Sequence, residues 1–134
     1  EIRDTRRIVA LSPHFAAFVP YAATTPYEVW IIPRRHCTDF GEIDSHEQQD
    51  LADTLRSILM RLARQLEDPD YNMVVLSGSR YKTGEPHLHW YIRITPRILT
   101  RAGFEIGSGM SINPMLPEDN ALDLKMSRVA EEVL

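Results

Sequence analysis

The sequence has a single cysteine, no long apolar run and no excess of basic charge. Because Cys37 stands alone among the 134 residues, no internal disulfide can form, and no Cys-x-x-Cys pair suggests a structural zinc site. We therefore expect a reducing, cytoplasmic setting. No apolar stretch approaches the roughly 20 residues that span a bilayer. The net charge of -4 is not that of a general nucleic-acid binder, so we expect neither membrane nor nucleic acid as a partner.

The size and composition indicate one globular domain over residues 1–134. A chain of about 150 residues buries roughly two-thirds of its unfolded surface, so a core of its own is possible. The 43% hydrophobic and 25% charged residues are ordinary for a globular protein. Because the chain opens at Glu1 and enters strand-like sequence almost at once, we expect it to be a piece of a longer polypeptide.

Hydrophobic patterns predict an antiparallel sheet with two helices. Short apolar and β-branched runs predict strands at residues 7–11, 15–19, 27–32, 71–76 and 87–95, and an edge strand at 104–106. Ser45 and Gln48 match a capping box, so a long amphipathic helix should start at Ser45 and end near Asp68-Pro69. Pro117 and the acids after it predict a second helix that continues to Val133. The fold class is therefore α+β.

The most informative motif is the pair His87 and His89, one residue apart in an apolar, aromatic run. Alternate strand positions share a face, so both rings should lie on one face of a central antiparallel strand. Leu88 and Trp90 should then face the long helix. Two neighbouring imidazoles can bind a metal, bind phosphate, or act as a nucleophile with its helper.

A loop that suits a phosphate group precedes this pair. It offers the hydroxyls of Ser77 and Ser79, the cations Arg80 and Lys82, and several backbone N–H groups. We predict that these four residues bind the phosphate of a substrate.

The order of motifs resembles a histidine-triad (HIT) domain. The residues that carry the resemblance are Ile31 to His36, Tyr71-Asn72, His87-Leu88-His89 and Thr95-Pro96-Arg97, with the long helix after the first of them. Within that superfamily, further segments are similar to the C-terminal half of galactose-1-phosphate uridylyltransferases and cover nearly the whole chain. They are residues 18–23, 26–30, 104–109 and 112–114.

The resemblance implies a HIT-like antiparallel sheet with one long packed helix and a C-terminal helix. By position, His89 matches the nucleophilic second histidine of the motif and His87 the first, while Tyr91 replaces the third. We expect the Tyr91 phenol to bind substrate or phosphate through hydrogen bonds, although it lacks the acceptor nitrogen of a neutral imidazole. His36 matches a position where HIT domains commonly hold histidine, and we expect it to bond backbone.

The implied activity is nucleotidyl transfer between UDP-glucose and a hexose 1-phosphate. Such enzymes carry two HIT-like halves with the nucleophile in the N-terminal one, and this chain resembles the other half. The expected partners are a nucleotide sugar or hexose 1-phosphate, a second copy of the chain, and an N-terminal half. Some relatives hold zinc or iron here, but Arg93 follows Tyr91 on the same face and is no ligand, so we expect no cofactor.

Two other functions remain open at this point. The chain could be a degenerate HIT fold that serves as a nucleotide-binding or dimerisation module without catalysis. It could also be a stand-alone HIT hydrolase that uses His89.

Overall fold

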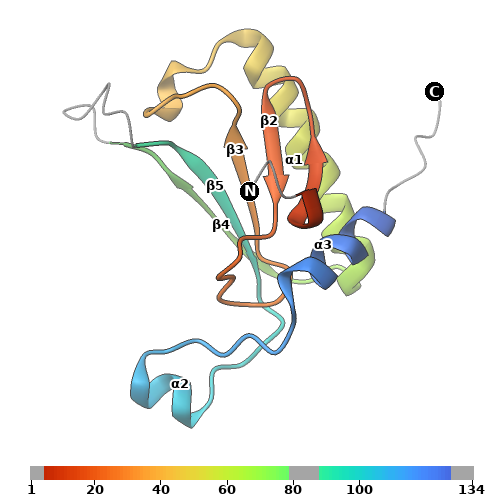
Figure 1. Ribbon diagram of the computed structural model, residues 1–134, viewed down its shortest axis with the longest axis vertical. Coiled ribbons are helices and arrows are strands. Elements are labelled where there is room, and N and C mark those ends of the chain that lie inside the picture. The colour runs from red at the N-terminus through yellow and green to blue at the C-terminus, as the bar shows by residue number, and fades with distance from the viewer. Residues whose placement is uncertain (1–4, 79–87, 128–134) are drawn as a thin grey trace.

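The computed structural model describes residues 5–78 and 88–127, which form a five-stranded antiparallel sheet with helices on one face (Figure 1). The strands are β1 (Ile8–Leu11), β2 (Phe15–Phe18), β3 (Val29–Pro33), β4 (Tyr71–Leu76) and β5 (Tyr91–Pro96), and their order across the sheet is β1-β2-β3-β5-β4. The helices are α1 (Ser45–Leu66), α2 (Gly103–Ser108) and α3 (Pro117–Met126), with short 3-10 turns η1 (Thr5–Arg7) and η2 (Phe40–Glu42). The predicted α+β class is confirmed.

Alternation along the strands separates a core face from an outer face. On β5, Ile92 and Ile94 are buried in a cluster that also contains residues of α1 and α3. Tyr91, Arg93 and Thr95 lie on the opposite side of β5, which we call the outer face. The same alternation places Ile31 of β3 in the core and leaves Trp30 half-buried on the outer face.

Helix α1 begins at Ser45, as predicted, but its N-cap is one residue earlier than the predicted cap. The N-cap is Asp44, whose carboxylate accepts hydrogen bonds from the backbone N–H groups of His46 and Glu47, and Glu47 closes the capping box on the Asp44 N–H. The predicted box of Ser45 and Gln48 is therefore wrong by one position. A carboxylate at Asp44 satisfies two orphan N–H groups at the positive end of the helix dipole, which a hydroxyl cannot do as well.

The core is centred on α1 and on Trp90. Ile58 is 0% exposed and Leu62 2% exposed, whereas Leu55 is only partly buried. The Trp90 ring is fully buried, with its centroid 5.9 Å from that of Phe15 and 5.0 Å from that of Phe40. Aromatic rings at these separations fill a core densely, so the strands and α1 form one packed unit.

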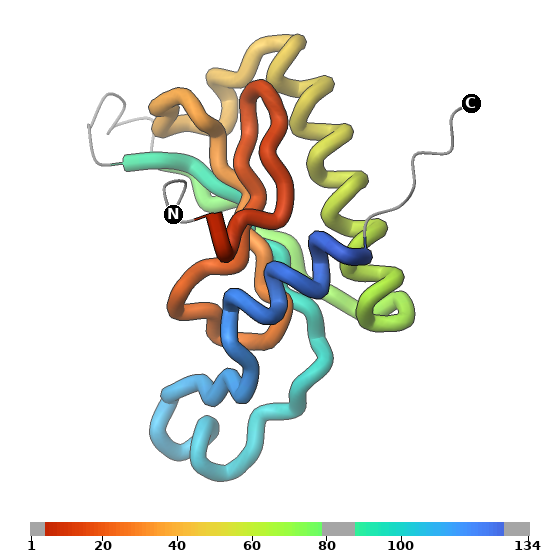
Figure 2. Tube along the Cα trace, turned by 45° about the vertical axis from the view of Figure 1, so that its right-hand side comes forward, coloured from red at the N-terminus to blue at the C-terminus, as the bar shows by residue number. Residues whose placement is uncertain are grey.

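The segment expected as an edge strand at residues 104–106 is instead helix α2. Its first turn is closed by Glu105, whose carboxylate accepts from the backbone N–H groups of Ala102 and Ile112. Gly109, at a φ of 73°, ends the helix in a conformation that favours glycine. These local bonds favour a helix over a strand. Figures 1 and 2 show α2 at the tip of an excursion that leads from β5 to α3.

The two edges of the sheet differ. The β1 edge is four residues long, carries an irregularity in register between Ile8 and Ala10, and lies beside α3. β4 has six residues and no charged side chain, and among the described strands it pairs with β5 alone. Met73 and Val75 remain 46% and 42% exposed. Short, irregular or covered edges resist pairing with other strands, so β1 is protected and β4 is open.

Candidate functional site

His89 lies two residues before β5, outside any strand. Residues 88–90 carry no strand assignment, and the Trp90 N–H donates to the Cys37 carbonyl rather than to the sheet ladder. The prediction that the strand begins at His87 is therefore wrong for residues 88–90. His87 itself lies outside the described residues, so a shared face with His89 stays a prediction. Trp90 is buried, as predicted.

The structure brings His36 against His89. The two ring centroids are 5.6 Å apart with an interplanar angle of 58°. His36 is exposed in the turn after β3, and His89 is half-buried ahead of β5. Because β3 and β5 pair antiparallel, the end of one strand and the start of the other meet at one end of the sheet. The sequence shows both histidines but not this pairing, so their contact was missed.

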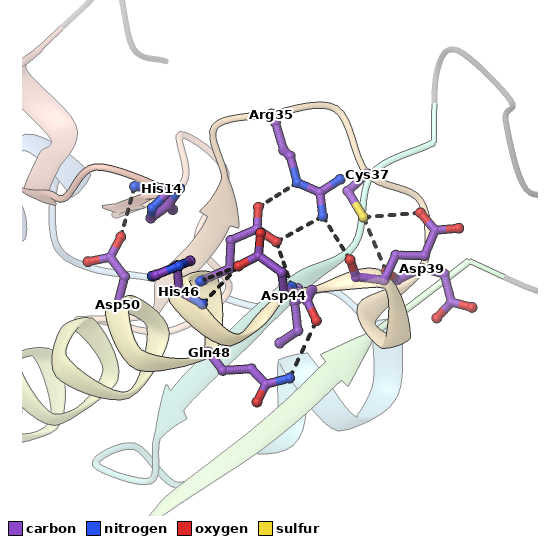
Figure 3. A network of polar contacts seen from close by, with 11 residues as sticks. His14, Arg35, Cys37, Asp39, Asp44, His46, Gln48 and Asp50 are labelled. Carbon is purple, nitrogen blue, oxygen red and sulfur yellow. Dashed lines mark hydrogen bonds and ion pairs between the residues drawn. The ribbon is translucent and has the colours of Figure 1, made fainter.

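Hydrogen bonds fix the segment that carries His36 (Figure 3). Arg35 binds the Glu47 carboxylate through Nε and Nη2, and Nη2 also donates to the Glu42 carbonyl. This bond from Arg35 lowers the pKa of Glu47 to about 2. On the other side of His36, the buried Cys37 thiol donates to the Asp39 carbonyl, and burial raises its pKa. A protonated, buried thiol is a poor nucleophile, so Cys37 has a structural role.

Of the five residues predicted to bind substrate or phosphate, the structure describes Tyr91 and, in the loop, Ser77. Its Oγ donates to a carboxylate oxygen of Asp39 at 3.1 Å and accepts from the Phe40 N–H at 3.0 Å. The next residue, Gly78, donates to the Thr38 carbonyl, and a Cβ there would lie 2.8 Å from that oxygen, so only glycine fits without a shift. Ser77 thus holds the loop of residues 38–40, and phosphate binding by it stays a prediction. Ser79, Arg80 and Lys82 lie outside the described residues.

Tyr91 is the first residue of β5 and faces outward. Its ring stacks on Trp30 of β3, with centroids 4.4 Å apart and an interplanar angle of 21°. The indole N–H of Trp30 donates to the carboxylate of Glu28 at 2.8 Å. Trp30 and Tyr91 therefore form a fixed aromatic platform on the outer face, and Tyr91 follows His89 by two residues in the sequence.

A cleft that the sequence reading missed lies at the other end of β5. Its volume is about 310 Å³, and its lining includes Asn72, Thr95, Arg97 and Arg101 together with Thr24 and Ser111. Asn72 and Thr95 are directly paired across β4 and β5 on the outer face. The carboxylate oxygens of Glu105, also in the lining, are taken by backbone N–H groups. The strand alternation alone could have indicated that Thr95 faces outward here.

The described residues do not complete a metal site. Among residues 5–78 and 88–127, no three His, Cys, Asp or Glu side chains are placed to hold a metal ion together. His36 and His89 supply two imidazoles, short of the four ligands of a structural zinc site or the three of a catalytic one. In the same part of the chain, no helix combines the length and the apolar character needed to cross a membrane.

Comparison with known proteins places the chain in a family. The sequence profile described as "Galactose-1-phosphate uridyl transferase, C-terminal domain" matches residues 1–125. An ADP-glucose phosphorylase of Arabidopsis thaliana is 38% identical over 123 residues, which are 90% of this chain and 35% of that protein. A galactose-1-phosphate uridylyltransferase of Thermotoga maritima is 27% identical over 137 residues, 96% of this chain and 43% of that protein. The chain thus spans less than half the length of these relatives.

Solved structures agree with this placement. The crystal structure of an ADP-glucose phosphorylase from Arabidopsis thaliana with bound ADP-glucose superimposes with a TM-score of 0.84 at 35% identity, covering 92% of this chain and 41% of that one. A HIT-like protein from Bartonella henselae, 13% identical, has a TM-score of 0.66 over 90% of this chain and 85% of that chain, which shows that the fold is HIT-like. From its sequence and its fold, the chain belongs to the galactose-1-phosphate uridyl transferase C-terminal domain family.

Proposed function

We propose that the chain is the C-terminal half of a two-part nucleotidyltransferase that acts on a nucleotide sugar and a hexose 1-phosphate. The observation that carries this proposal is the family match over residues 1–125. A similar chain binds ADP-glucose in its crystal structure, which supports a nucleotide sugar as the class of substrate.

The outer face offers binding groups for such a ligand. In the cleft, Arg97 and Arg101 supply guanidinium groups, which match the oxygens of a phosphate in pairs. Thr95 and Asn72 supply a hydroxyl and an amide, which suit the hydroxyls of a hexose. The role of this half is therefore to bind and orient the hexose 1-phosphate, and orientation alone contributes a large part of the rate in such reactions.

The open β4 edge supports a second half. Relatives carry more than half of their length outside the region that this chain matches. Beside β4, at the end of α1, a largely apolar hollow of about 260 Å³ is lined by Leu59, Met60, Pro69 and Tyr71, among others. A strand of the N-terminal half that pairs with β4 would satisfy the backbone groups of this edge and bury its apolar side chains.

The contact of His36 with His89 favours a second candidate, a stand-alone HIT enzyme. One nitrogen of His89, Nδ1, lies 3.3 Å from the Trp90 carbonyl oxygen. A proton on Nδ1 would leave the lone pair on Nε2, the form in which imidazole attacks phosphorus. In this candidate His89 is the nucleophile and His36 its neighbour.

Intact-mass measurement separates the two candidates. After incubation of the chain with UDP-glucose or ADP-glucose, we expect no nucleotidyl adduct. General acid–base catalysis and positioning of the second substrate together raise the rate by more than about 10²-fold, and both are incomplete in one half. An adduct that is absent in His89→Gly would establish the stand-alone enzyme instead. Calorimetry with glucose 1-phosphate tests the binding role.

For the calorimetry, Arg97→Gln and Arg101→Gln should each weaken binding of glucose 1-phosphate. The matched control is Arg64→Gln, since Arg64 is an exposed arginine of α1 outside the cleft lining. Equal affinity in all three variants, or no binding by the unaltered chain, contradicts the assignment of the cleft.

A further inference from the structure

The carboxylate of Glu28 is buried between the cleft and the aromatic platform. Glu28 directly precedes β3 and is 1% exposed. One of its oxygens, Oε2, accepts from the backbone N–H of Thr24 at 2.9 Å and from the Thr24 hydroxyl at 2.7 Å. The other oxygen, Oε1, accepts from the indole N–H of Trp30 at 2.8 Å. Glu28 therefore joins Thr24, which lines the cleft, to Trp30 of the platform.

These contacts fix the direction of the hydrogen bond between Thr24 and Glu28. The N–H groups of Thr24 and Trp30 can only donate, and together they engage both carboxylate oxygens, so Glu28 is an acceptor at each. The Thr24 hydroxyl therefore donates its single proton to Oε2, and its Oγ1 is left with acceptor sites alone. Because a bond to a carboxylate is charge-assisted and polarises the hydroxyl, these sites accept more strongly than those of an isolated hydroxyl.

The turn that carries Thr24 is held in place by further bonds. Within the turn, the Ala23 N–H donates to the Pro20 carbonyl. From outside it, the Asn113 amide donates to the Ala23 carbonyl at 3.1 Å, which ties the turn to the excursion that carries α2 (Figure 1). Thr24 itself is an exposed residue of the cleft lining. Its oxygen is therefore a preorganised acceptor, and preorganised groups bind a ligand with a smaller loss of conformational entropy.

We propose that Glu28 positions the Thr24 hydroxyl as an acceptor for a hydroxyl group of the hexose, and so sets the direction in which a hexose 1-phosphate enters the cleft. The inference rests on the proposed function for the class of ligand. A phosphate dianion offers acceptors alone and cannot bond to the acceptor sites of Thr24, whereas a sugar hydroxyl can donate to them. Arg97 and Arg101 offer donors alone and favour the phosphate. The ligand therefore lies with a sugar hydroxyl at Thr24 and its phosphate at the two arginines.

Thr24→Val tests the acceptor, because valine is close to threonine in shape and lacks the hydroxyl. NMR titration of the 134-residue chain measures affinity for glucose 1-phosphate, glucose and inorganic phosphate. We expect Thr24→Val to weaken glucose 1-phosphate and glucose about 3- to 10-fold, the size of one neutral hydrogen bond, and inorganic phosphate less than about 2-fold. Thr24→Ser keeps the hydroxyl and should bind as the unaltered chain does. The control is Thr100→Val, since Thr100 is exposed but lies outside the cleft lining.

Sugar analogues test the direction of the bond. A deoxy analogue of glucose 1-phosphate lacks one hydroxyl, and a deoxyfluoro analogue carries there a fluorine that accepts weakly and cannot donate. At the hydroxyl that contacts Thr24, we expect the two analogues to lose affinity equally, and both losses to disappear in Thr24→Val. A deoxyfluoro analogue that binds more tightly than the deoxy analogue at this position would show that Thr24 donates, which overturns the proposal.

Glu28→Leu tests the positioning residue itself. Leucine deprives the Thr24 hydroxyl of its carboxylate, so the hydroxyl can turn and donate to the ligand. The deoxyfluoro analogue should then bind more tightly than the deoxy analogue, a difference that a purely structural role of Glu28 would not produce. Equal affinities of the two analogues for Glu28→Leu overturn the role of Glu28. If Glu28→Leu does not fold, the analogue series with the unaltered chain and Thr24→Val decides.

The outcomes also separate this inference from the proposed function. Unchanged affinity of Thr24→Val for glucose 1-phosphate overturns the inference and leaves the function in place. Binding of glucose that depends on Thr24, without binding of glucose 1-phosphate, supports the acceptor and contradicts the function. Equal losses for all three ligands in Thr24→Val mean that the substitution disturbs the cleft as a whole, which overturns the inference. Absence of binding for all three ligands contradicts both.

Discussion

The imidazole of His36 lies beside that of His89, with ring centroids 5.6 Å apart. His36 lies in the turn after β3 and His89 two residues before β5, and they meet because β3 pairs with β5. On the His36 side, the pair between Arg35 and Glu47 ties the turn to the first turn of α1 (Figure 3). The geometry of this corner therefore depends on the sheet, the turn and the helix together.

This contact should be visible by NMR. Replacing His36 by alanine removes a ring next to His89, so the Cε1–H resonance of His89 should move because its ring-current environment changes. His46→Ala is the control, since His46 is an exposed residue of the first turn of α1. The same displacement in both variants, or none in His36→Ala, would show that the rings are not in contact in solution.

The position of the helix cap can be checked by a pair of substitutions. Asp44→Ala should lower the free energy of unfolding by about 0.5–2 kcal/mol, because two N–H groups of the first turn lose their acceptor. Ser45→Ala should cost less than about 0.5 kcal/mol, since Ser45 is not the cap. Urea denaturation of both variants gives the two values, and the reverse order would restore Ser45 as the N-cap.

Stability should depend on the charge of Glu47 in a defined pH window. The bond from Arg35 lowers the pKa of Glu47 to about 2, from 4.5 in the unperturbed group. Because the pKa is lower in the folded state, the ionised Glu47 carboxylate stabilises the fold fully above pH 4.5. This stabilisation is lost as the pH falls toward 2 and the carboxylate is protonated. Glu47→Gln should be about 1–3 kcal/mol less stable at pH 7, with a difference that shrinks below pH 4.5.

The partner variant provides the control for this pH dependence. Arg35→Gln removes the other half of the pair and should show the same loss of acid sensitivity in denaturation curves between pH 2 and 7. A stability difference for Glu47→Gln that stays constant over that range would mean that the carboxylate is not held by Arg35.

Two apolar residues of α1, Ile58 and Leu55, should differ in their contribution to the core. Ile58 is 0% exposed, so Ile58→Ala should cost about 2–5 kcal/mol through lost burial and a residual cavity. Leu55 is only partly buried, so Leu55→Ala should cost about 1–2 kcal/mol. Thermal or urea unfolding checks both, and equal losses would mean that the helix is rotated about its axis.

The open edge should control self-association of the chain. Met73→Lys places a charge on β4 and should reduce any concentration-dependent association seen by sedimentation velocity, since edge charges block strand pairing. Leu122→Lys is the matched control, a similarly exposed apolar residue on α3. Association that responds to Leu122→Lys and ignores Met73→Lys would assign the interface to α3 instead.

Local sequence patterns predicted most helices and strands, whereas the site depends on contacts between segments that are far apart in the sequence. The spacing from Leu51 to Leu66 and the apolar runs of β2 to β5 predicted the long helix and these strands, although the start of β5 was predicted several residues too early. The helix cap at Asp44 and helix α2 were mispredicted because several neighbouring side chains could close the same turn, and only the folded chain selects among them. Glu105 closes α2 through a bond to Ile112, seven residues away.

The site itself required tertiary information. The histidine motif identified His89 by its local context, but its contact with His36 depends on the β3–β5 pairing. The cleft joins residues from five separate segments, from Thr24 to Ile112, and only the folded chain brings these segments together. The sequence identified Arg93 only as a residue that cannot bind metal, because the burial of its Nε without an acceptor among the described residues is a property of the folded chain.

The difference between the two sheet edges limits how the chain can assemble. A sheet with two open edges can add units at both ends and grow into a fibre, whereas a sheet that is closed at β1 accepts one neighbour at β4 and no more. Once β4 is occupied, the joined sheet has a closed edge at this end, and addition stops. An assembly that uses β4 alone would therefore end at a pair of units, and an occupied β4 would not act as a seed for aggregation.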